Sequence, residues 1–405
     1  MSEFFSVRTV SDALAGFRPA HRTATGPLPI AEAVGRMPAS GVAAPASLPG
    51  FARSAVDGYA VAAMATHGAG ESLPAYLRVI GAVEMGRLPN FEVGGDTVAA
   101  IPTGGALPPG ADAVAMIEHT ADLGDGRIEL SRPLAAGDNV IKPGDDVAKG
   151  APIVDIGRPL RPQEIGLLAA SGITEVDVHD LPLVAVISTG DEVVPADTEP
   201  PSGKVRDANS YALAALVHEL GGRPWMLGIV ADDPGDLERV CRIALDRADV
   251  LVVSAGSSVG ARDATATVMS RLGSPGIWCH GLALKPGKPT LLADLDGRPA
   301  IGLPGNPVSA LVVMRLIGGP VIGRAGGSSG TDRGRRAQAV LERNVPSQAG
   351  RLDVIQVRLE GGRAIPLFGK ASQLSIMTQA DGYVVIPEPV QGLAAGSDVT
   401  VEVYR

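Results

Sequence analysis

The stretch from Leu181 to Gly323 constrains the fold most, because short apolar runs alternate there with longer amphipathic segments. The segments LVAVISTGDE, MLGIV and DVLVVSAG are typical of strands, and ANSYALAALVHELGG, DPGDLERVCRIALDRA and ATATVMSRL are typical of helices. In the first of these helices we expect Asn209 or Ser210 as the N-cap and Gly221 as the stop. Strands and helices that alternate in this way predict a parallel α/β sheet.

The regions on either side of this stretch have a different pattern of apolar and turn residues. Between Gly50 and Asp146, short apolar stretches alternate with Gly and Pro turns, which predicts an all-β insert. A Gly/Ser linker follows the α/β stretch, and the chain from about Arg336 returns to short strands and turns, which predicts a small β domain. Short helices are expected at 11–17, 29–34 and 161–171.

The composition excludes several classes of protein. Hydrophobic residues make up 45% and charged residues 20% of the chain, as in a globular protein with a core. The net charge of -9 argues against nucleic acid as a partner, because an acidic chain repels phosphate backbones. Cys241 and Cys279 form no CxxC pair, so we expect two buried free thiols in a reducing cytoplasm. The sequence shows neither a secretion signal nor a transmembrane run, so we expect no membrane partner.

Polar loops after the expected strands are the candidate binding sites, because ligands of open parallel sheets bind beyond the carboxyl ends of the strands. The first loop offers two hydroxyls, a glycine and two carboxylates at Ser188, Thr189, Gly190, Asp191 and Glu192; its ordinary alternative is a plain turn with capping side chains. The second is a run of small residues before a helix, which can cradle a phosphate on backbone N–H groups or can be a flexible loop. Its candidate contacts are Ser254, Gly256, Ser257, Ser258 and Gly260.

Two further loops of the α/β stretch are candidate sites. One carries two positive charges, and prolines restrict the backbone of the other. Lys285 and Lys288 lie three residues apart between prolines, and they form either an anion site or a solvated surface loop. A P-loop is excluded, because Pro289 stands where that motif requires Ser or Thr. The segment GLPGNPVSA precedes an apolar helix, and it forms either a ligand contact or a tight turn. Its candidate residues are Pro304, Gly305, Asn306 and Pro307.

The expected β insert carries three more polar turns, around Asp57, Thr103 and Asp146. Taken alone, each of these turns is more simply explained as a polar turn exposed to solvent. The chain has no HExxH and no GxGxxG after a strand, and the sequence shows no nucleophile–base pair.

Taken in this order, the segments resemble the molybdopterin molybdenumtransferase family, which is called MoeA in bacteria and matches the E domain of gephyrin in animals. The matching segments are RSAVDGYAV, PTGGALPPGADAVAMIE, KPGDD, STGDEVV, DANSYAL, GIVADDP, SAGSSVGARD, KPGKP and GLPGNPVSA. A looser match follows around 371–387.

The resemblance implies a multidomain α/β plus β protein. We expect a central three-layer α/β domain with a parallel-type sheet, similar to the molybdopterin-binding domain of MogA. An inserted β domain, an elongated helical and β N-terminal region and a small C-terminal β-barrel-like domain complete the expected fold. The expected boundaries are 1–54 with 147–180 for the N-terminal region, 55–146 for the insert, 181–323 for the α/β domain and 333–405 for the last domain.

The resemblance also implies which residues line the active cleft. These are Asp57, Thr103 and Asp146 from the insert of a partner subunit, and Glu192, Asp232, Asp263, Lys285, Lys288, Pro304 and Pro307 from the α/β domain. Four positions depart from the family pattern: Ala100 and Gln356 stand where arginine is usual, Val56 replaces a common Met, and Ala255 replaces a glycine.

The implied reaction inserts molybdate into adenylylated molybdopterin and releases AMP. Lysines can offset the charge of the phosphoanhydride, and Mg²⁺ would be held by Glu192, Asp232 and Asp263, since it favours oxygen ligands. The implied assembly is a homodimer, and the upstream adenylyltransferase is a further candidate partner.

Two alternatives remain open. The first is adenylyl transfer to molybdopterin, against which the extra β domains argue, because that activity needs only the α/β core. The second is a pterin-binding scaffold without activity, which the departures at Ala100 and Gln356 keep open.

Overall fold

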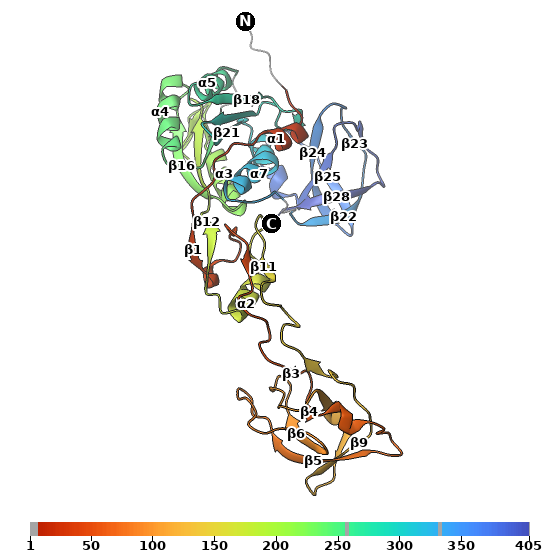
Figure 1. Ribbon diagram of the computed structural model, residues 1–405. Coiled ribbons are helices and arrows are strands. Elements are labelled where there is room, and N and C mark those ends of the chain that lie inside the picture. Colours follow the sequence, from red (N-terminus) through yellow and green to blue (C-terminus); the bar gives the residue numbers. More distant parts are fainter. Residues whose placement is uncertain (1–6, 256–258, 331–333, 405) are drawn as a thin grey trace. The chain divides into compact units, whose positions relative to one another are not determined.

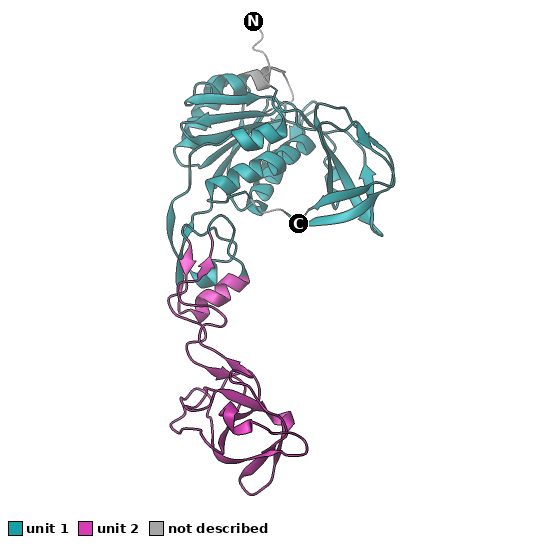
Figure 2. Cartoon of the chain, turned by 45° about the vertical axis from the view of Figure 1, so that its right-hand side comes forward, with its two compact units in different colours: residues 1–40, 156–161, 175–405 teal, residues 41–155, 162–174 magenta. Residues whose placement is uncertain are grey.

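The computed structural model describes residues 7–255, 259–330 and 334–404; of residues 259–263 it describes only the backbone. The chain forms two compact units (Figure 2). Unit 1 comprises residues 1–40, 156–161 and 175–405, and unit 2 comprises residues 41–155 and 162–174.

Unit 1 contains a six-stranded sheet in the order β16-β13-β17-β21-β20-β18 (Figure 1). The strands are β13 (Leu183–Thr189), β16 (Arg223–Val230), β17 (Val250–Ser254), β18 (Pro275–His280), β20 (Leu291–Leu295) and β21 (Arg298–Leu303). The first four strands in the spatial order are parallel, and β20 is antiparallel to both of its neighbours. The prediction of a parallel-type α/β sheet is confirmed, with one antiparallel strand that the sequence pattern did not reveal.

Helices cover both faces of this sheet, because the central strand β13 is apolar on both sides. Val184 and Val186 pack in one core cluster with α1 (Val10–Gly16), α3 (Asn209–Glu219), α6 (Pro307–Val313), a π-turn η4 (Met314–Gly318) and α7 (Gly319–Ala325). Ala185 and Ile187 pack in a second cluster with α4 (Pro234–Leu245) and α5 (Val259–Met269). Alternate residues of a strand point to opposite faces, so this division makes three layers, as expected.

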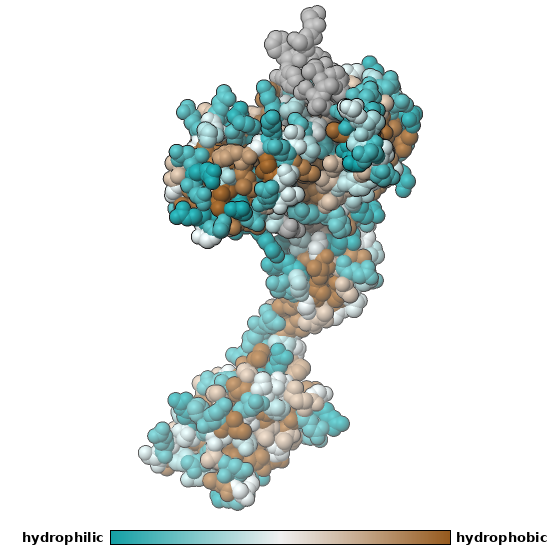
Figure 3. All heavy atoms as spheres, turned by 180° about the vertical axis from the view of Figure 1, so that it is seen from behind, coloured by the Kyte–Doolittle hydropathy of each residue, from teal (hydrophilic) through white to brown (hydrophobic). Residues whose placement is uncertain are grey.

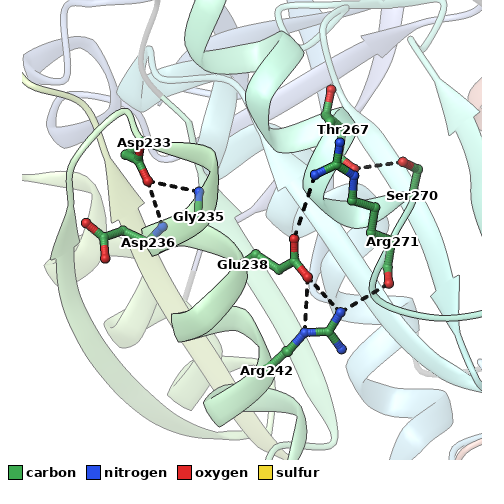
Figure 4. Close-up of polar contacts among 8 residues, drawn as sticks. All are labelled: Asp233, Gly235, Asp236, Glu238, Arg242, Thr267, Ser270 and Arg271. Atoms are coloured by element: carbon green, nitrogen blue, oxygen red, sulfur yellow. Dashed lines mark hydrogen bonds and ion pairs between the residues drawn. The ribbon is translucent and has the colours of Figure 1, made fainter.

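The helix ends follow local chemistry, and one expectation was wrong. In α4, Asp233 is the N-cap and accepts hydrogen bonds from the backbone N–H groups of Gly235 and Asp236, both at 2.9 Å (Figure 4). Neither Asn209 nor Ser210 caps α3; instead Asp207 Oδ1 accepts the N–H of Ser210 at 3.0 Å. Gly221 follows the last turn of α3 with φ +83°, so the expected stop is confirmed.

Two other helical elements, η1 (Ile30–Glu32) and α5, differ slightly from expectation. The expected helix at 29–34 is the single 3₁₀ turn η1. In α5, the helix begins five residues before the ATATVMSRL segment.

The helical stretch Pro307–Ala325 is long and apolar enough to cross a membrane by length and composition, with a mean hydropathy of 1.5. Two-thirds of it is buried within the protein, where Val312, Ile317 and Ile322 belong to the core cluster around α3. Its apolar character therefore follows from its place in the core of the α/β domain.

The C-terminal part of unit 1 is a small β-barrel, as expected. Its strands are β22 (Arg336–Leu341), β24 (Leu352–Glu360), β25 (Arg363–Leu367), β26 (Gly382–Ile386) and β28 (Asp398–Val403). They pair in the order β24-β25-β22-β28-β26, and β26 pairs again with β24, which closes the barrel. The short strands β23 (Val345–Pro346) and β27 (Gly392–Leu393) pair beside it, and α8 (Ser375–Thr378) lies between β25 and β26.

The barrel and the α/β domain are joined through β19 (Leu284–Lys285), which pairs parallel with β24. A backbone hydrogen bond of 3.1 Å from Val308 N to Ala371 O joins them again. The N-terminal region of unit 1 adds an antiparallel pair, β1 (Thr25–Pro29) with β12 (Glu175–His179).

Unit 2 is built around a six-stranded sheet in the order β7-β4-β6-β5-β9-β8, so the all-β insert is confirmed. These strands are β4 (Gly58–Val61), β5 (Ala75–Ala82), β6 (Thr97–Ile101), β7 (Ala113–Met116), β8 (Thr120–Asp122) and β9 (Arg127–Leu130). The unit also contains the pairs β3 (Arg53–Ser54) with β10 (Val140–Ile141) and β2 (Val42–Ala43) with β11 (Pro152–Val154), and the helix α2 (Pro162–Ala170).

Candidate functional site

The candidate site lies at the carboxyl edge of the unit 1 sheet. Since β13, β16, β17 and β21 are parallel, the loops that follow them leave the sheet at one edge. The strand order reverses between β13 and β17, because β16 lies on one side of β13 and β17 lies on the other. A reversal of this kind opens a crevice for ligands. The pairings also make β18 parallel to β21, so the loop with Lys285 and Lys288 begins at the same edge.

Buried hydroxyl groups hold the first two loops in place. Ser188 Oγ donates to Asp207 Oδ1 at 3.0 Å and lies 2.9 Å from Ser210 Oγ. Asn209 Nδ2 donates to Ser254 Oγ at 2.8 Å and to the carbonyl of Gly305 at 2.9 Å. The hydroxyls of Ser188 and Ser254, which we expected at the ligand, therefore make bonds within the protein that fix the loops.

The side chains of Asp207 and Asn209 were missed as site residues. Their signal in the sequence was the DANSYAL segment, which places one short polar side chain just before a helix and another at its first residue.

A cluster of carboxylates lies beside the end of β13. The backbone N–H of Asp232 donates to Asp191 Oδ1 at 3.1 Å, which joins the loop after β16 to the loop after β13. Gly190 has φ +142°, a backbone conformation that residues with a Cβ atom rarely adopt, so glycine is favoured at this position. Burial raises the pKa of Asp232, and the charges of Asp191 and Glu192 raise it further. Asp191 was not among the expected metal ligands.

Two buried oxygens at this edge lack a hydrogen-bond partner among the residues that the structure describes: Thr189 Oγ1 and Asp232 Oδ1. Buried polar atoms are nearly always paired, so such atoms mark a place for water, an ion or a ligand. Thr189 was expected at the ligand and Asp232 at the metal, and both are placed at this edge.

The remaining expected contacts of the second loop are only partly visible. Gly256, Ser257 and Ser258 lie outside the described residues. Gly260 and Asp263 belong to the first turns of α5, where only the backbone is described. Within the described parts of the chain, no three His, Cys, Asp or Glu residues are grouped closely enough to hold a metal ion.

The segment GLPGNPVSA turns from β21 into α6. Pro304 is buried, Asn306 is exposed, and Pro307 occupies the first turn of the helix. Gly305 contributes a carbonyl to Asn209, so this loop is tied to the loop after β17 through one side chain.

A cavity of about 660 Å³ lies between the KPGKP loop and the barrel. Its lining includes the expected residues Lys285 and Lys288, and it adds Arg351 and Lys370 from the C-terminal segment. No ion pair joins the three lysines to an acid within residues 7–255, 259–330 and 334–404. The cavity therefore has a positive lining suited to an anion. Glu192, Asp232, Ser188 and Ser254 are not part of that lining.

In unit 2, the structure brings Asp57 and Thr103 together. The backbone N–H of Thr103 donates to Asp57 Oδ1 at 2.8 Å, and both side chains are exposed. Gly58 follows Asp57 because a Cβ atom there would lie 1.8 Å from the carbonyl oxygen of Ala115. Asp146 is exposed on a separate turn, where its N–H bonds to Leu48 O.

Three family models match nearly all of the chain. They are the MoeA N-terminal region (domain I and II) at residues 8–172, a probable molybdopterin binding domain at 185–324 and the MoeA C-terminal region (domain IV) at 338–404.

Individual relatives agree with the family models. A molybdopterin molybdenumtransferase of Haemophilus influenzae is 32% identical over 95% of this chain and 95% of its own length. Molybdopterin molybdenumtransferase 2 of Mycobacterium tuberculosis is 34% identical over 92% of this chain and 94% of its own length. The crystal structure of the molybdopterin biosynthesis moeA protein from Pyrococcus horikoshii OT3 matches 98% of this chain and 100% of its own, with 29% identity and a TM-score of 0.86.

Proposed function

This chain belongs to the MoeA family, and from that premise we propose that it is a molybdopterin molybdenumtransferase, which inserts molybdenum into the pterin in molybdenum cofactor biosynthesis. We further propose that its substrates are molybdate and adenylylated molybdopterin, and that the reaction releases AMP. The observation that carries this proposal is that a group of carboxylates lies at the carboxyl edge of the sheet and that the KPGKP loop, which lines a cationic cavity, begins at the same edge.

The lysines are proposed to bind the anionic oxygens of the substrates. Lys285 and Lys288 line the cavity and are exposed, so their ammonium groups can reach a phosphate or an oxyanion there. Their charge lowers the energy of the negative charge that grows on the AMP leaving group as the phosphoanhydride breaks. The N-terminus of α5 adds backbone N–H groups at the same edge.

The carboxylates are proposed to hold Mg²⁺. Asp232 Oδ1 is buried without a described partner, and Asp191 and Glu192 concentrate further negative charge beside it. Mg²⁺ keeps several waters and uses one or two carboxylates together with substrate phosphates, so the small number of grouped acids fits this ion. Glu192 and Asp232 would hold it with Asp263, and the bound ion would polarise phosphate oxygens.

We also propose a homodimer in which Asp57, Thr103 and Asp146 act from the partner subunit. Eight of the large hydrophobic side chains that are exposed lie in unit 2, and Figure 3 shows apolar residues on the surface of this unit. A partner subunit that covers these side chains would remove their apolar area from water. A cytoplasmic location fits the buried free thiols of Cys241 and Cys279.

The test of the activity mixes the purified protein with adenylylated molybdopterin, molybdate and Mg²⁺. We expect AMP release and molybdenum bound to the pterin, measured by chromatography and elemental analysis. If neither product forms, the proposed function is wrong. Supplying ATP and unmodified molybdopterin instead tests the alternative, because an adenylyltransferase would then produce the adenylylated pterin.

The test of the shared site uses two inactive variants, Asp57→Asn and Lys288→Met. Random mixing of their subunits should restore roughly a quarter of the activity, because half of the dimers then hold one intact site of two. No recovery after verified subunit exchange would exclude a site built from both subunits.

A further inference from the structure

We infer that three arginines, Arg18, Arg22 and Arg324, form a second anion site at the edge of the unit 1 sheet opposite the candidate functional site. Its ligand is a phosphate group, carried by inorganic phosphate or by a phosphate monoester. We call these residues the arginine cluster. The site goes beyond the proposed function, since molybdenum insertion is assigned to other residues.

The arginine cluster lies at the amino edge of the sheet. His21 belongs to the segment that carries the two N-terminal arginines, and its Nε2 atom lies 2.7 Å from Oδ1 of Asp249, the residue directly before β17. Because β17 is parallel to β13 and β21, all three strands begin at this edge and end at the edge of the candidate site. Thr23 N donates to Ala325 O at 2.9 Å, which brings the last turn of α7, with Arg324, to the same place.

Backbone carbonyl groups of the 15–22 segment gather the three guanidinium groups. Arg324 Nη2 donates to the carbonyl of Phe17 at 3.1 Å, directly beside Arg18 in the chain. Arg18 Nε donates to the carbonyl of Ala15 at 3.1 Å, and Arg22 Nη1 donates to two carbonyl groups of its own segment, at 2.7 and 3.2 Å. Arg18 and Arg22 are exposed and Arg324 is half-buried, so a ligand can approach the cluster from solvent.

No carboxylate balances these charges. None of the three arginines forms an ion pair with an acid in the part of the chain that the structure describes. Asp249 uses both of its oxygens within the protein, for His21 and for a backbone N–H at the start of β13. The pKa of Arg324 is lowered to about 10, first by burial and then by the charges of Arg18 and Arg22. The folded protein therefore holds mutually repelling positive charges that a bound anion would stabilise.

The helix ends account for only part of this charge. Arg324 lies in the last turn of α7 and Arg18 follows the end of α1, where cations offset the partial negative charge of the helix. Each helix C-terminus carries roughly half a negative charge, so the two ends offset about one of the three positive charges. About two positive charges remain, which matches the charge of a phosphate dianion.

A buried hydroxyl beside the cluster also lacks a partner. Thr23 follows Arg22 in the chain and is only 6% exposed. Its Oγ1 atom makes no hydrogen bond with any described residue. Buried polar atoms are nearly always paired, so this hydroxyl marks a place for a water molecule or a ligand oxygen next to the arginines.

The number of donors favours a phosphate group over a carboxylate. A guanidinium group presents five N–H donors in a planar fork, and a carboxylate with two oxygens satisfies one such fork. Three forks require an anion with more oxygens and more than one negative charge. A phosphate group has three free oxygens and a charge of about -1.5 to -2 at pH 7.

The experiment measures binding of inorganic phosphate by isothermal titration calorimetry at constant ionic strength. The parent protein carries Lys285→Gln and Lys288→Gln, which remove the cationic lining of the other cavity, so that the remaining binding reports on the arginine cluster. Arg324→Gln and Arg22→Gln should each weaken binding roughly tenfold. Arg22 is exposed, so its variant keeps the test valid if Arg324→Gln fails to fold. The matched control is Arg239→Gln, an exposed change on α4 of the same domain, which should leave the affinity unchanged.

Two further ligands identify the chemistry. Acetate should bind at least about tenfold more weakly than phosphate, because one carboxylate satisfies one fork. Equal affinities would overturn the assignment of a phosphate group. Tighter binding of glycerol 3-phosphate than of inorganic phosphate would identify a monoester as the ligand, and weaker binding would identify inorganic phosphate.

Hydrogen exchange of the wild type locates the bound anion. Phosphate should slow the exchange of backbone N–H groups in residues 13–24, because the anion fastens this segment to the last turn of α7. Arg324→Gln should remove this protection. Protection confined to the KPGKP loop would place the anion in the other cavity and would overturn the inference.

The inference also fails if the parent protein binds no phosphate, if both arginine variants bind as tightly as the parent, or if Arg239→Gln causes the same loss. These failures are distinct from a failure of the proposed function, which AMP release and molybdenum insertion measure separately.

Discussion

Replacement of Asp232 by Asn should raise the stability of the protein in the absence of divalent cations and weaken its stabilisation by Mg²⁺. The amide has the same shape as the carboxylate but no charge. The pKa of Asp232 is raised first by burial and then by the charges of Asp191 and Glu192, so the charged form is disfavoured in the folded protein. Removing the charge should therefore favour folding when no cation offsets it.

The size of the effect follows from the separation and the exposure of the charges. Two unit charges about 4 Å apart in water interact by about 1 kcal/mol. Asp191 is exposed and Glu192 is half-buried, so solvent and salt keep the gain below that value. For a domain of this size, 1 kcal/mol shifts the unfolding temperature by roughly 2–4 °C, and we expect a rise at the lower end of that range.

The pH dependence has a definite sign. The pKa of Asp232 is raised on folding, so its carboxylate destabilises the folded state only above the ordinary pKa of 3.8. The loss of folding stability reaches its full size above the raised pKa of the folded state. The stability gain of Asp232→Asn should therefore be present at pH 7 and should disappear as the pH falls below 3.8.

Thermal unfolding in EDTA and in Mg²⁺ measures both effects. At a Mg²⁺ concentration of ten times Kd, the wild type should gain about 1.4 kcal/mol and the variant much less. Asp398→Asn is the control, because it removes an exposed carboxylate at the start of β28, in the barrel. The reasoning is refuted if Asp232→Asn unfolds at a lower temperature than the wild type in EDTA, or if Mg²⁺ stabilises both proteins equally.

Three further outcomes are expected. Lys288→Gln should raise the KM for the adenylylated pterin roughly tenfold and flatten its salt dependence, whereas Lys149→Gln in unit 2 should change neither; equal effects would contradict the cationic cavity. Asn209→Ala removes the bonds to the loops after β17 and β21, so it should cost about 1–3 kcal/mol of stability in urea unfolding and lower kcat; unchanged kcat would argue against a positioning role. Gly58→Ala would place Cβ 1.8 Å from a strand carbonyl, so proteolysis should cut unit 2 and spare unit 1; loss of both units would show that they do not fold independently.

Local patterns in the sequence determined most of the fold. The apolar runs of Leu183–Thr189 and Val250–Ser254, separated by amphipathic helices, predicted the parallel strands and hence a shared edge for the loops that follow them. Asp233 before Pro234 set the start of α4, and Gly221 set the end of α3, because capping and left-handed turns depend on residues a few positions apart.

The tertiary structure alone decided how the site residues are used. The bond from Asn209 to Gly305 spans 96 residues of chain and that from Tyr404 to Gln356 spans 48, and periodicity carries no information at such separations. For the same reason the sequence indicated lysines at 285 and 288 but not the cavity that the barrel completes around them. Hydrogen-bonding and charge at a site depend on which surfaces the folded chain brings together, and the local pattern of residues fixes only the elements that carry those surfaces.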